Sequence, residues 1–449
     1  MDERVLFDRF HEALDVAIPQ GAFERLQGAL ASATVERPRL SWHLPRWGRA
    51  AQMVAAVLLV AVVAAAIVAG FVASHQATVP ARSGGTGPVI FPTQMVTATT
   101  GWSVSLEVIP PEIWRTTDGG RAWTDVSPPA SPPPMAFAGG ATFFLDAQHA
   151  WISRFSQGAP GNYSWAVYRS SDGGRSWQLG QAVPAARFDL LAPQSLYFID
   201  PNHGWLLTSA VSGASIESLP TLLYSTSDGG MRWNLISSGG NLPQSGCGVR
   251  IAFATTTTGW LAEACDTATP TLMVTHDGGA TWNPQPMPVS ANTVCPCAFD
   301  GAPLFSDALH GVVVLRGSPG VVFQTTDGGN TWTPHALPGE GQSAIDFVDP
   351  QHGWTIAGPR SLLGKSPNGT FSTSPGTTVP LEQTSDGGLT WTAVPNNLVL
   401  DSPIGRIFDI HFVDRKTGFA TRSGRTGATQ LAETRDGGRT WFTVSELHG

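Results

Sequence analysis

Aspartates that recur at nearly even intervals are the most conspicuous residues with chemical potential. The pattern Ser/Thr-x-Asp-Gly-Gly-x-x-Trp occurs seven times, and successive aspartates are 49 to 59 positions apart. A carboxylate can act as a general acid, a general base or a metal ligand. Seven equivalent copies cannot all serve one catalytic centre, so we interpret them as structural residues that accept hydrogen bonds within their own turns. The motif residues are Asp118, Asp172, Asp228, Asp277, Asp327, Asp386 and Asp436, with Trp123, Trp177, Trp233, Trp282, Trp332, Trp391 and Trp441.

Histidines occupy one position of a second recurring pattern, Asp-x-x-His. Imidazole is a common zinc ligand, but a zinc site needs several ligands around one ion. These histidines belong to different repeats and should lie too far apart to share a metal, so we interpret them as turn residues. We predict no metal site and no cofactor. The four histidines are His149, His203, His310 and His352.

Asp346 and His411 form the most promising pair outside the repeated motifs. Each lies three residues before a turn aspartate, Asp349 or Asp414, in neighbouring repeats. The two side chains could therefore face each other and act as a catalytic or binding pair. Buried polar groups are usually hydrogen-bonded, and we favour a structural hydrogen-bonded pair over catalysis.

Glycoside hydrolysis is the enzymatic activity to weigh here, and it needs two carboxylates about 5–10 Å apart. Glu263 and Asp266 are the nearest such candidates in sequence outside the motifs. A sialidase-like enzyme would also need an arginine cluster and a tyrosine, and no Arg-Ile-Pro segment precedes the repeats. The glycine-rich stretch 358–366 has one residue too many for a phosphate-binding loop. We therefore predict that the protein is not an enzyme.

A recurring pattern of strands and turns surrounds the motifs. Asp-Gly-Gly supplies residues that tolerate positive φ, as tight hairpin turns require. A second element precedes each copy, an apolar strand followed by Gly-Trp or a close variant, as at Gly204-Trp205. Each unit of about 50 residues should then hold four short strands. Seven such units predict an all-β, seven-bladed β-propeller over residues 89–449.

The repeated motif resembles the Asp-box, or bacterial neuraminidase repeat. The pairing of Phe-x-Asp-x-x-His-Gly-Trp with Thr-x-Asp-Gly-Gly-x-Thr-Trp is most similar to the photosystem II stability/assembly factor family of seven-bladed propellers. The likeness covers roughly residues 89–449. It implies the fold much more specifically than the function, because Asp-box propellers include assembly factors, glycosidases and receptors.

Four cysteines lie in the part of the chain expected outside the cytoplasm, where disulfides persist. Cys247 and Cys265 flank a predicted hairpin symmetrically, which favours a cross-strand bridge between them among the three pairings that four cysteines allow. Cys295 and Cys297 would then pair with each other or stay reduced. No nearby histidine completes a metal site with them.

One uncharged stretch predicts a membrane anchor. Residues 53–73 contain no charge, and a helix of 21 residues spans about 31 Å, the thickness of a bilayer core. A cleaved signal peptide would be shorter and nearer the N-terminus. More arginines precede the stretch than follow it, so we expect residues 1–50 in the cytoplasm as short helices or a poorly ordered tail. The expected order is a transmembrane helix at 51–73, a flexible stalk at 74–88 and an extracytoplasmic propeller in the cell membrane.

The charge of the chain limits its partners. The sequence has 26 Lys and Arg against 34 Asp and Glu, a net charge of −8. Residues 1–50 hold seven arginines and seven acids, so the excess negative charge lies beyond them. Such a body does not attract phosphate backbones, and we predict no nucleic-acid partner. The scarcity of lysine beside arginine suggests a bacterial source.

Binding residues are expected in the loops that are longest in three of the repeats: 156–163, 209–220 and 357–382. Long loops on a rigid scaffold are where binding residues tend to collect. Tyr163 and Trp165 are the candidate contact residues there. The alternative is that these loops are disordered decoration.

Three functions fit these observations. The first is a non-enzymatic scaffold that binds another membrane or envelope protein. The second is a hydrolase of cell-envelope or environmental glycans, and the third is a transmembrane sensor that signals to residues 1–50. We prefer the first, with the bilayer itself as a further partner through residues 51–73.

Overall fold

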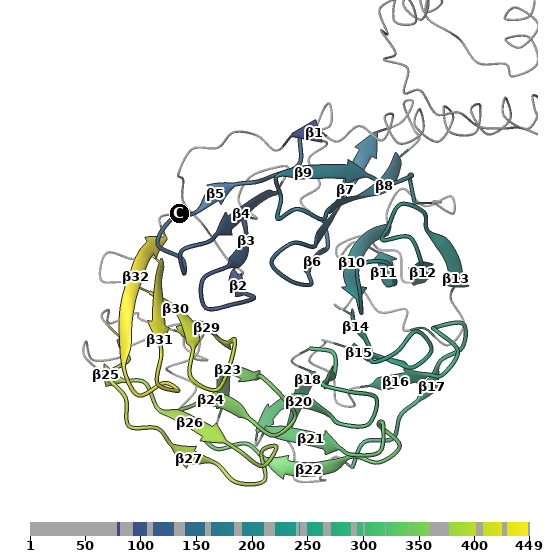
Figure 1. Ribbon diagram of the computed structural model, residues 1–449. Helices are drawn as coiled ribbons and strands as arrows, with labels where there is room; N and C mark the ends of the chain where they lie inside the picture. The colour runs from purple at the N-terminus through teal and green to yellow at the C-terminus, as the bar shows by residue number, and fades with distance from the viewer. Residues whose placement is uncertain are drawn as a thin grey trace, which may run out of the picture. The chain divides into compact units, whose positions relative to one another are not determined.

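Seven antiparallel sheets follow one another around a central axis in the computed structural model (Figure 1). The first strand of each sheet lies nearest the axis, and later strands lie progressively further out. The main strands of each sheet pair in chain order. We number the sheets blade 1 to blade 7 in chain order.

The chain divides into two units, Met1–Ala73 and Ser74–Gly449, and the described residues belong to the second. They contain no helix with the length and hydrophobicity needed to cross a bilayer. The predicted segments 1–50 and 51–73 lie outside the described residues. The structure describes residues 79–80, 93–105, 111–129, 140–157, 163–183, 191–210, 221–238, 242, 249–263, 271–288, 294–299, 301–318, 320–339, 341–358, 377–400, 407–423 and 429–447.

The first four blades each contain four strands of their own. Blade 1 comprises β2 (Thr93–Met95), β3 (Gly101–Ser105), β4 (Glu112–Thr116) and β5 (Thr124–Asp125). Blade 2 comprises β6 (Thr142–Phe144), β7 (Ala150–Gln157), β8 (Tyr163–Ser170) and β9 (Ser176–Leu179). Blade 3 comprises β10 (Leu191–Phe198), β11 (Gly204–Ala210), β12 (Leu222–Thr226) and β13 (Asn234–Ser238). Blade 4 comprises β14 (Val249–Phe253), β15 (Gly259–Glu263), β16 (Leu272–Thr275) and β17 (Asn283–Pro284).

The last three blades follow the same plan with one addition, since two strands rather than one form the inner edge of blade 5. Blade 5 comprises β18 (Val294–Phe299), β19 (Leu304–Phe305), β20 (Gly311–Ser318), β21 (Val321–Thr325) and β22 (Thr333–Ala336). Blade 6 comprises β23 (Gly341–Phe347), β24 (Gly353–Gly358), β26 (Leu381–Thr384) and β27 (Thr392–Ala393). Blade 7 comprises β29 (Ile407–Phe412), β30 (Gly418–Ser423), β31 (Thr429–Thr434) and β32 (Trp441–Leu447).

Two pairings supplement the blades. β1 (Val79–Pro80), within the segment expected to be a stalk, pairs with the outer strand β9 of blade 2. β25 (Thr377–Thr378) pairs with β28 (Val399–Leu400) beside blade 6.

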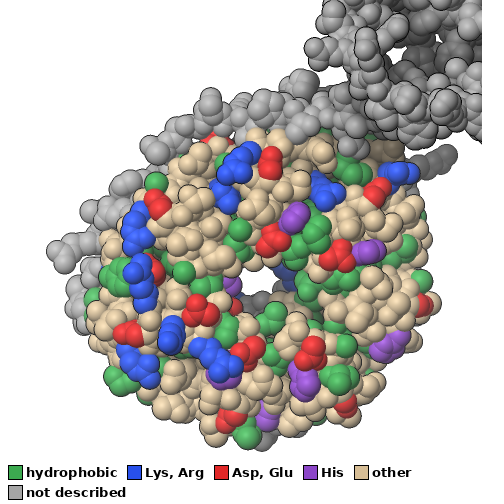
Figure 2. Space-filling view, in the orientation of Figure 1, with side chains coloured by type: hydrophobic (Ala, Val, Ile, Leu, Met, Phe, Trp, Pro, Cys, Tyr) green, Lys and Arg blue, Asp and Glu red, His purple; other side chains and the backbone are tan. Residues whose placement is uncertain are grey.

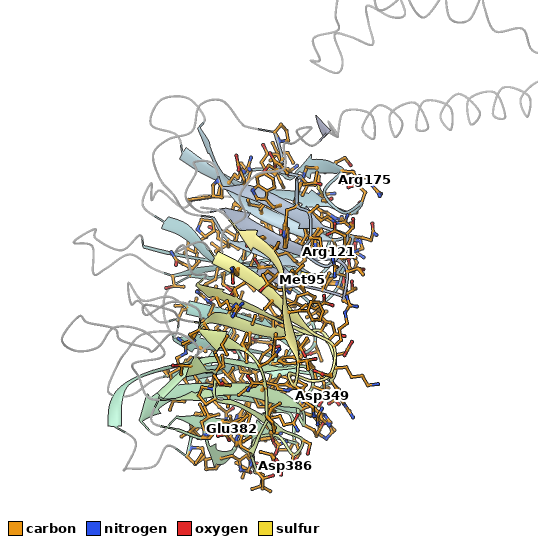
Figure 3. The ribbon with its side chains drawn as sticks, turned by 90° about the vertical axis from the view of Figure 1, so that its left-hand side faces the viewer. Met95, Arg121, Arg175, Asp349, Glu382 and Asp386 are labelled. Atoms are coloured by element: carbon orange, nitrogen blue, oxygen red, sulfur yellow. The ribbon has the colours of Figure 1, made fainter. Side chains whose placement is uncertain are left out.

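The two kinds of turn in a blade lie on one face of the ring, which we call the turn face. In all seven Asp-boxes both glycines have positive φ, 71–77° for the first and 80–100° for the second. The N–H of the first glycine donates to a carbonyl in the turn between the blade's first two strands, at 2.8–2.9 Å, as Gly119 does to Thr99. Figure 3 shows labelled residues of both kinds of turn, Arg121, Arg175, Asp349 and Asp386, along the same side.

Tryptophans join neighbouring blades across the core. In four of the seams between blades, the Gly-Trp tryptophan stacks on a phenylalanine of the next blade with ring centroids 3.6–4.0 Å apart. That phenylalanine then meets the Asp-box tryptophan of its own blade edge-on, at 6.1–6.2 Å. Edge-on contact is a favoured arrangement of aromatic pairs. The stacked pairs are Trp151–Phe198, Trp205–Phe253, Trp260–Phe305 and Trp354–Phe412.

The seam between blades 7 and 1 is built differently. Phe419 occupies the tryptophan position and Met95 the phenylalanine position, so these two residues cannot form an aromatic stack. They pack with Leu431, Trp114 and Trp123 in one buried cluster that spans both blades. The blades are otherwise joined here by polar contacts, described next.

Candidate functional site

A depression of about 690 Å³ lies at the seam between blades 7 and 1 on the turn face. Its wall comes from turns of both blades, so residues more than 300 positions apart meet in it. Four of the lining side chains are cationic and two are carboxylates. The lining residues are Ala98, Thr99, Arg121, Asp414, Arg415, Lys416, Thr417, Glu433 and Arg435.

Glu433 anchors two of the arginines across the seam. Its side chain is 1% exposed, and Arg435 of the same blade approaches it through Nε at 2.6 Å and Nη2 at 3.2 Å. Arg121 of blade 1 lies 3.6 Å away on the other side. Hydrogen bonding and the charge of Glu433 raise the pKa of Arg435. One buried carboxylate therefore holds two guanidinium groups, each at least half exposed, at the rim of the depression.

The opposite rim carries Arg415 and Lys416. Arg415 lies 3.5 Å from Asp349 of blade 6 and is 65% exposed. The Asp414 carboxylate accepts hydrogen bonds from the backbone N–H groups of Lys416 and Thr417, at 2.7 and 2.8 Å. Burial alone would raise the pKa of Asp414, but these bonds lower it, so the carboxylate is engaged with backbone. The depression therefore has more positive than negative charge, in a chain with net charge −8. Figure 2 shows Lys and Arg side chains gathered along one side of this face.

The predicted pair Asp346 and His411 does come together, near the same seam but on the innermost strands. Asp346 Oδ2 lies 3.4 Å from His411 Nδ1 and accepts the backbone N–H of Phe412 at 2.6 Å. His411 Nε2 lies 2.7 Å from the Met95 carbonyl oxygen of blade 1. Burial alone would lower the pKa of His411, but Asp346 and the Met95 carbonyl together raise it to about 9. Both ring nitrogens are occupied by protein groups, which leaves the imidazole without a lone pair for proton abstraction.

One oxygen of each Asp-box carboxylate accepts the same two hydrogen bonds in every blade. Asp277 Oδ1 accepts the N–H of Thr281 at 2.8 Å and the hydroxyl of Thr275 at 2.8 Å, while its Oδ2 accepts the Thr281 hydroxyl at 2.6 Å. These bonds lower the pKa of Asp277 to about 2. The corresponding oxygen accepts equivalent bonds in the other six Asp-boxes, for Asp118, Asp172, Asp228, Asp327, Asp386 and Asp436.

Each Asp-x-x-His histidine bonds within its own turn. Nδ1 of His149, His203, His310 and His352 lies 2.8–3.0 Å from the aspartate three residues earlier. Among the described residues no three His, Cys, Asp or Glu side chains are grouped so as to hold a metal ion.

Comparisons with known proteins identify the architecture. No protein-family model matches the chain, and no curated protein matches it. A GH74 enzyme from Niastella koreensis is similar in structure, with 14% identity and a TM-score of 0.52 over 81% of this chain and 55% of that one. YCF48 bound to D1 peptide gives 15% identity and a TM-score of 0.44 over 80% of this chain and 94% of that one. YCF48 from Cyanidioschyzon merolae gives 16% and 0.44 over 82% and 99%. The seven-bladed β-propeller predicted from the repeats is confirmed. At 14–16% identity, these similarities show the fold alone.

The remaining sequence candidates fall at various places in the propeller. Trp165 of β8 is half-buried and packs against the cluster that contains Trp151, and its carbonyl accepts the N–H of Val183 at 2.6 Å. Tyr163 begins β8, but its side chain is outside the described set. Most of the three long loops also lies outside the described residues, as do Cys247, Cys265 and Asp266.

The basic depression was missed by sequence reasoning that compared loop lengths. A detectable signal existed in how blade 7 departs from the repeat. Its first turn has Arg415 and Lys416 where the other blades have uncharged residues, and its Asp-box carries Arg435 and Arg439. Comparing the charge at equivalent positions of each repeat would have marked this blade.

Proposed function

We propose that the protein is a scaffold that binds an acidic segment of another membrane or envelope protein at the basic depression of blades 7 and 1. One observation carries this proposal: cationic side chains are concentrated at one seam of a chain whose net charge is −8. Complementary charge steers association and selects partners. A rigid propeller holds these charges in place before a partner arrives, which lowers the entropic cost of binding.

The arginines are suited to carboxylate recognition. Arg121 and Arg435 are oriented from behind by the buried Glu433, and the guanidinium groups remain partly exposed. A planar guanidinium can give two parallel hydrogen bonds to a carboxylate. Lys416, on the opposite rim, adds a point charge that tolerates various geometries. Together they favour a segment that presents several carboxylates over a single ion.

We further propose that the scaffold acts at a membrane. The support is the uncharged stretch 53–73 and the excess of arginine before it, which together favour a single-pass anchor with the propeller outside the cytoplasm. A partner would then be a membrane or envelope protein within reach of the anchored propeller.

A crosslinked pull-down of the full-length protein from its native membrane, with mass spectrometry, tests this function. Arg415→Gln/Lys416→Gln should remove the captured partner. Arg175→Gln/Arg232→Gln removes the same charge from the turn face of blades 2 and 3 and should leave capture intact. Failure of the wild type to capture a stoichiometric protein, or equal capture by both double variants, would contradict the proposal.

A further inference from the structure

A second hollow of about 440 Å³ lies against the inner strands of blades 2 to 5, around the central opening visible in Figure 2. Its volume is within the usual range of small-molecule sites. Its lining includes Thr142, Gln194, Tyr197, Arg250 and Ala302. The depression at blades 7 and 1 shares none of its lining residues with this hollow.

The hollow lies where an inner strand is interrupted and where small residues form the wall. The inner strand β6 of blade 2 has three residues, and the inner edge of blade 5 is interrupted between β18, which ends at Phe299, and β19, which begins at Leu304. Small residues occupy much of the wall, among them Gly140, Ala141, Ala252 and Ala302. The interrupted inner edge of blade 5 and the small side chains leave the space between these blades unfilled.

Three polar side chains on this wall have unused hydrogen-bonding capacity. Among the described residues the Gln194 amide and the Tyr197 hydroxyl have no hydrogen-bond partner, and Arg250 reaches only its neighbour's carbonyl, that of Val249, at 3.5 Å. The Ser195 hydroxyl accepts the N–H of Ile251 at 3.4 Å, which places Gln194 and Arg250 on adjacent strands at one level. Polar groups that converge on a pocket fix the orientation and identity of its ligand.

The charge of the wall is unbalanced. Arg250 is exposed, and the described residues that line the hollow include neither aspartate nor glutamate. Arginine pairs with a ligand carboxylate through two parallel hydrogen bonds. The amide, the phenol and the hydroxyls of Ser195 and Thr142 suit a ligand that carries several hydroxyl groups, while the intervening alanines suit its C–H faces.

We propose that this hollow binds an acidic saccharide, with the sugar carboxylate on Arg250 and its hydroxyl groups on Gln194 and Tyr197. The site goes beyond the scaffold function proposed above and does not depend on it. It is a binding site, since none of its described side chains supplies a carboxylate for hydrolysis.

Calorimetric titration of the full-length protein tests the site with two acidic disaccharides, cellobiouronate and digalacturonate. Cellobiose differs from cellobiouronate in one group, CH₂OH in place of the carboxylate, and serves as the neutral control. At least one of the two acidic disaccharides should bind. If cellobiouronate binds, cellobiose should bind at least tenfold more weakly. Arg250→Gln should weaken acidic binding at least tenfold, whereas Arg175→Gln on the turn face should not change it.

A second variant separates the cavity from simple charge attraction. Ala302→Trp keeps Arg250 but places a large ring on the wall of the hollow, and it should abolish binding. Three results would overturn the proposal: neither acidic disaccharide binds, Ala302→Trp binds like the wild type, or inorganic phosphate competes as strongly as the sugar. The last result would indicate a general anion site. Circular dichroism of each variant checks that the propeller is intact.

Discussion

The imidazole of His411 on β29 donates to the Met95 carbonyl oxygen on β2 across 2.7 Å, and so joins the last blade to the first. The other ring nitrogen faces Asp346 of blade 6. Inner strands of three successive blades are thereby linked through one side chain. This occurs at the seam where Phe419 and Met95 stand in place of the usual tryptophan and phenylalanine, so a charged hydrogen bond helps to close the ring.

Ring closure should weaken at alkaline pH. Because the folded-state pKa of His411 is raised to about 9, its stabilising effect is complete below the ordinary value near 6.5 and is lost as the pH rises through 9. The free energy of unfolding should fall by up to about 3 kcal/mol between pH 7 and pH 10. Urea unfolding at a series of pH values measures this change.

Other groups also titrate above pH 8, so the comparison with variants is decisive. His411→Gln should be less stable than the wild type at pH 7 and nearly equal to it at pH 10. His203→Gln, at a surface turn of blade 3, should show no such convergence. A constant difference between wild type and His411→Gln across the range would contradict the charged bond.

Asp277 should stabilise blade 4 only while it is ionised. Its lowered pKa, about 2, means that the contribution is present above about pH 4 and is lost as the pH falls through 2. Asp277→Asn should cost about 1 kcal/mol at pH 7, since a charged acceptor of backbone and hydroxyl donors is replaced by a neutral one. Chemical denaturation at pH 7 and pH 2 should show the difference shrinking; an undiminished difference at pH 2 would be inconsistent with this assignment.

The two glycines Gly229 and Gly301 should respond oppositely to alanine. Gly229 has φ +73°, and an added Cβ would lie 2.7 Å from the Pro201 carbonyl oxygen. Gly229→Ala should therefore cost about 1–3 kcal/mol. An added Cβ at Gly301 meets nothing within 4 Å, so Gly301→Ala should be within about 0.5 kcal/mol of the wild type. Thermal melts of the two variants test this contrast, and similar losses would refute it.

The aromatic stack should make one seam more sensitive than another. Trp205 stacks on Phe253 at 3.6 Å and donates its indole N–H to the Gly278 carbonyl at 3.0 Å. Trp205→Leu should cost about 2–4 kcal/mol, from lost burial and an unpaired carbonyl. Phe419→Leu, at the seam without a stack, should cost about 1–1.5 kcal/mol. Denaturant midpoints compare the two, and equal losses would argue against a special role for stacking.

The number of blades was predictable because each blade is formed by one continuous segment that contains one Asp-box. Asp-Gly-Gly specifies a turn, and the strands on either side pair with each other. The proximity of Asp346 and His411 followed from their equivalent positions in adjacent repeats. The hydrogen bond from His411 to the Met95 carbonyl oxygen could not be predicted in this way, because it depends on how blade 7 meets residues more than 300 positions earlier.

The two hollows were hidden from sequence reasoning for the same reason. The basic depression combines Arg121 with Arg435, which no local pattern connects. The inner hollow depends on where β18 ends and β19 begins, and strand ends are set by packing between blades. Charges at repeat-equivalent positions, rather than loop lengths, would have pointed to the basic depression.

Each blade takes its described core strands from one continuous stretch, and among these strands none from blade 7 pairs into the sheet of blade 1. The ring closes between two complete sheets, one on each side of the seam between blades 7 and 1. The closed ring therefore does not determine the blade at which the chain begins. A circular permutant that begins at blade 3 and runs on from blade 7 into blade 1 would contain the same seven sheets and the same seven seams. Duplication of one unit of about 50 codons would likewise add a whole blade, so rings of this type can change size by recombination without rebuilding any sheet.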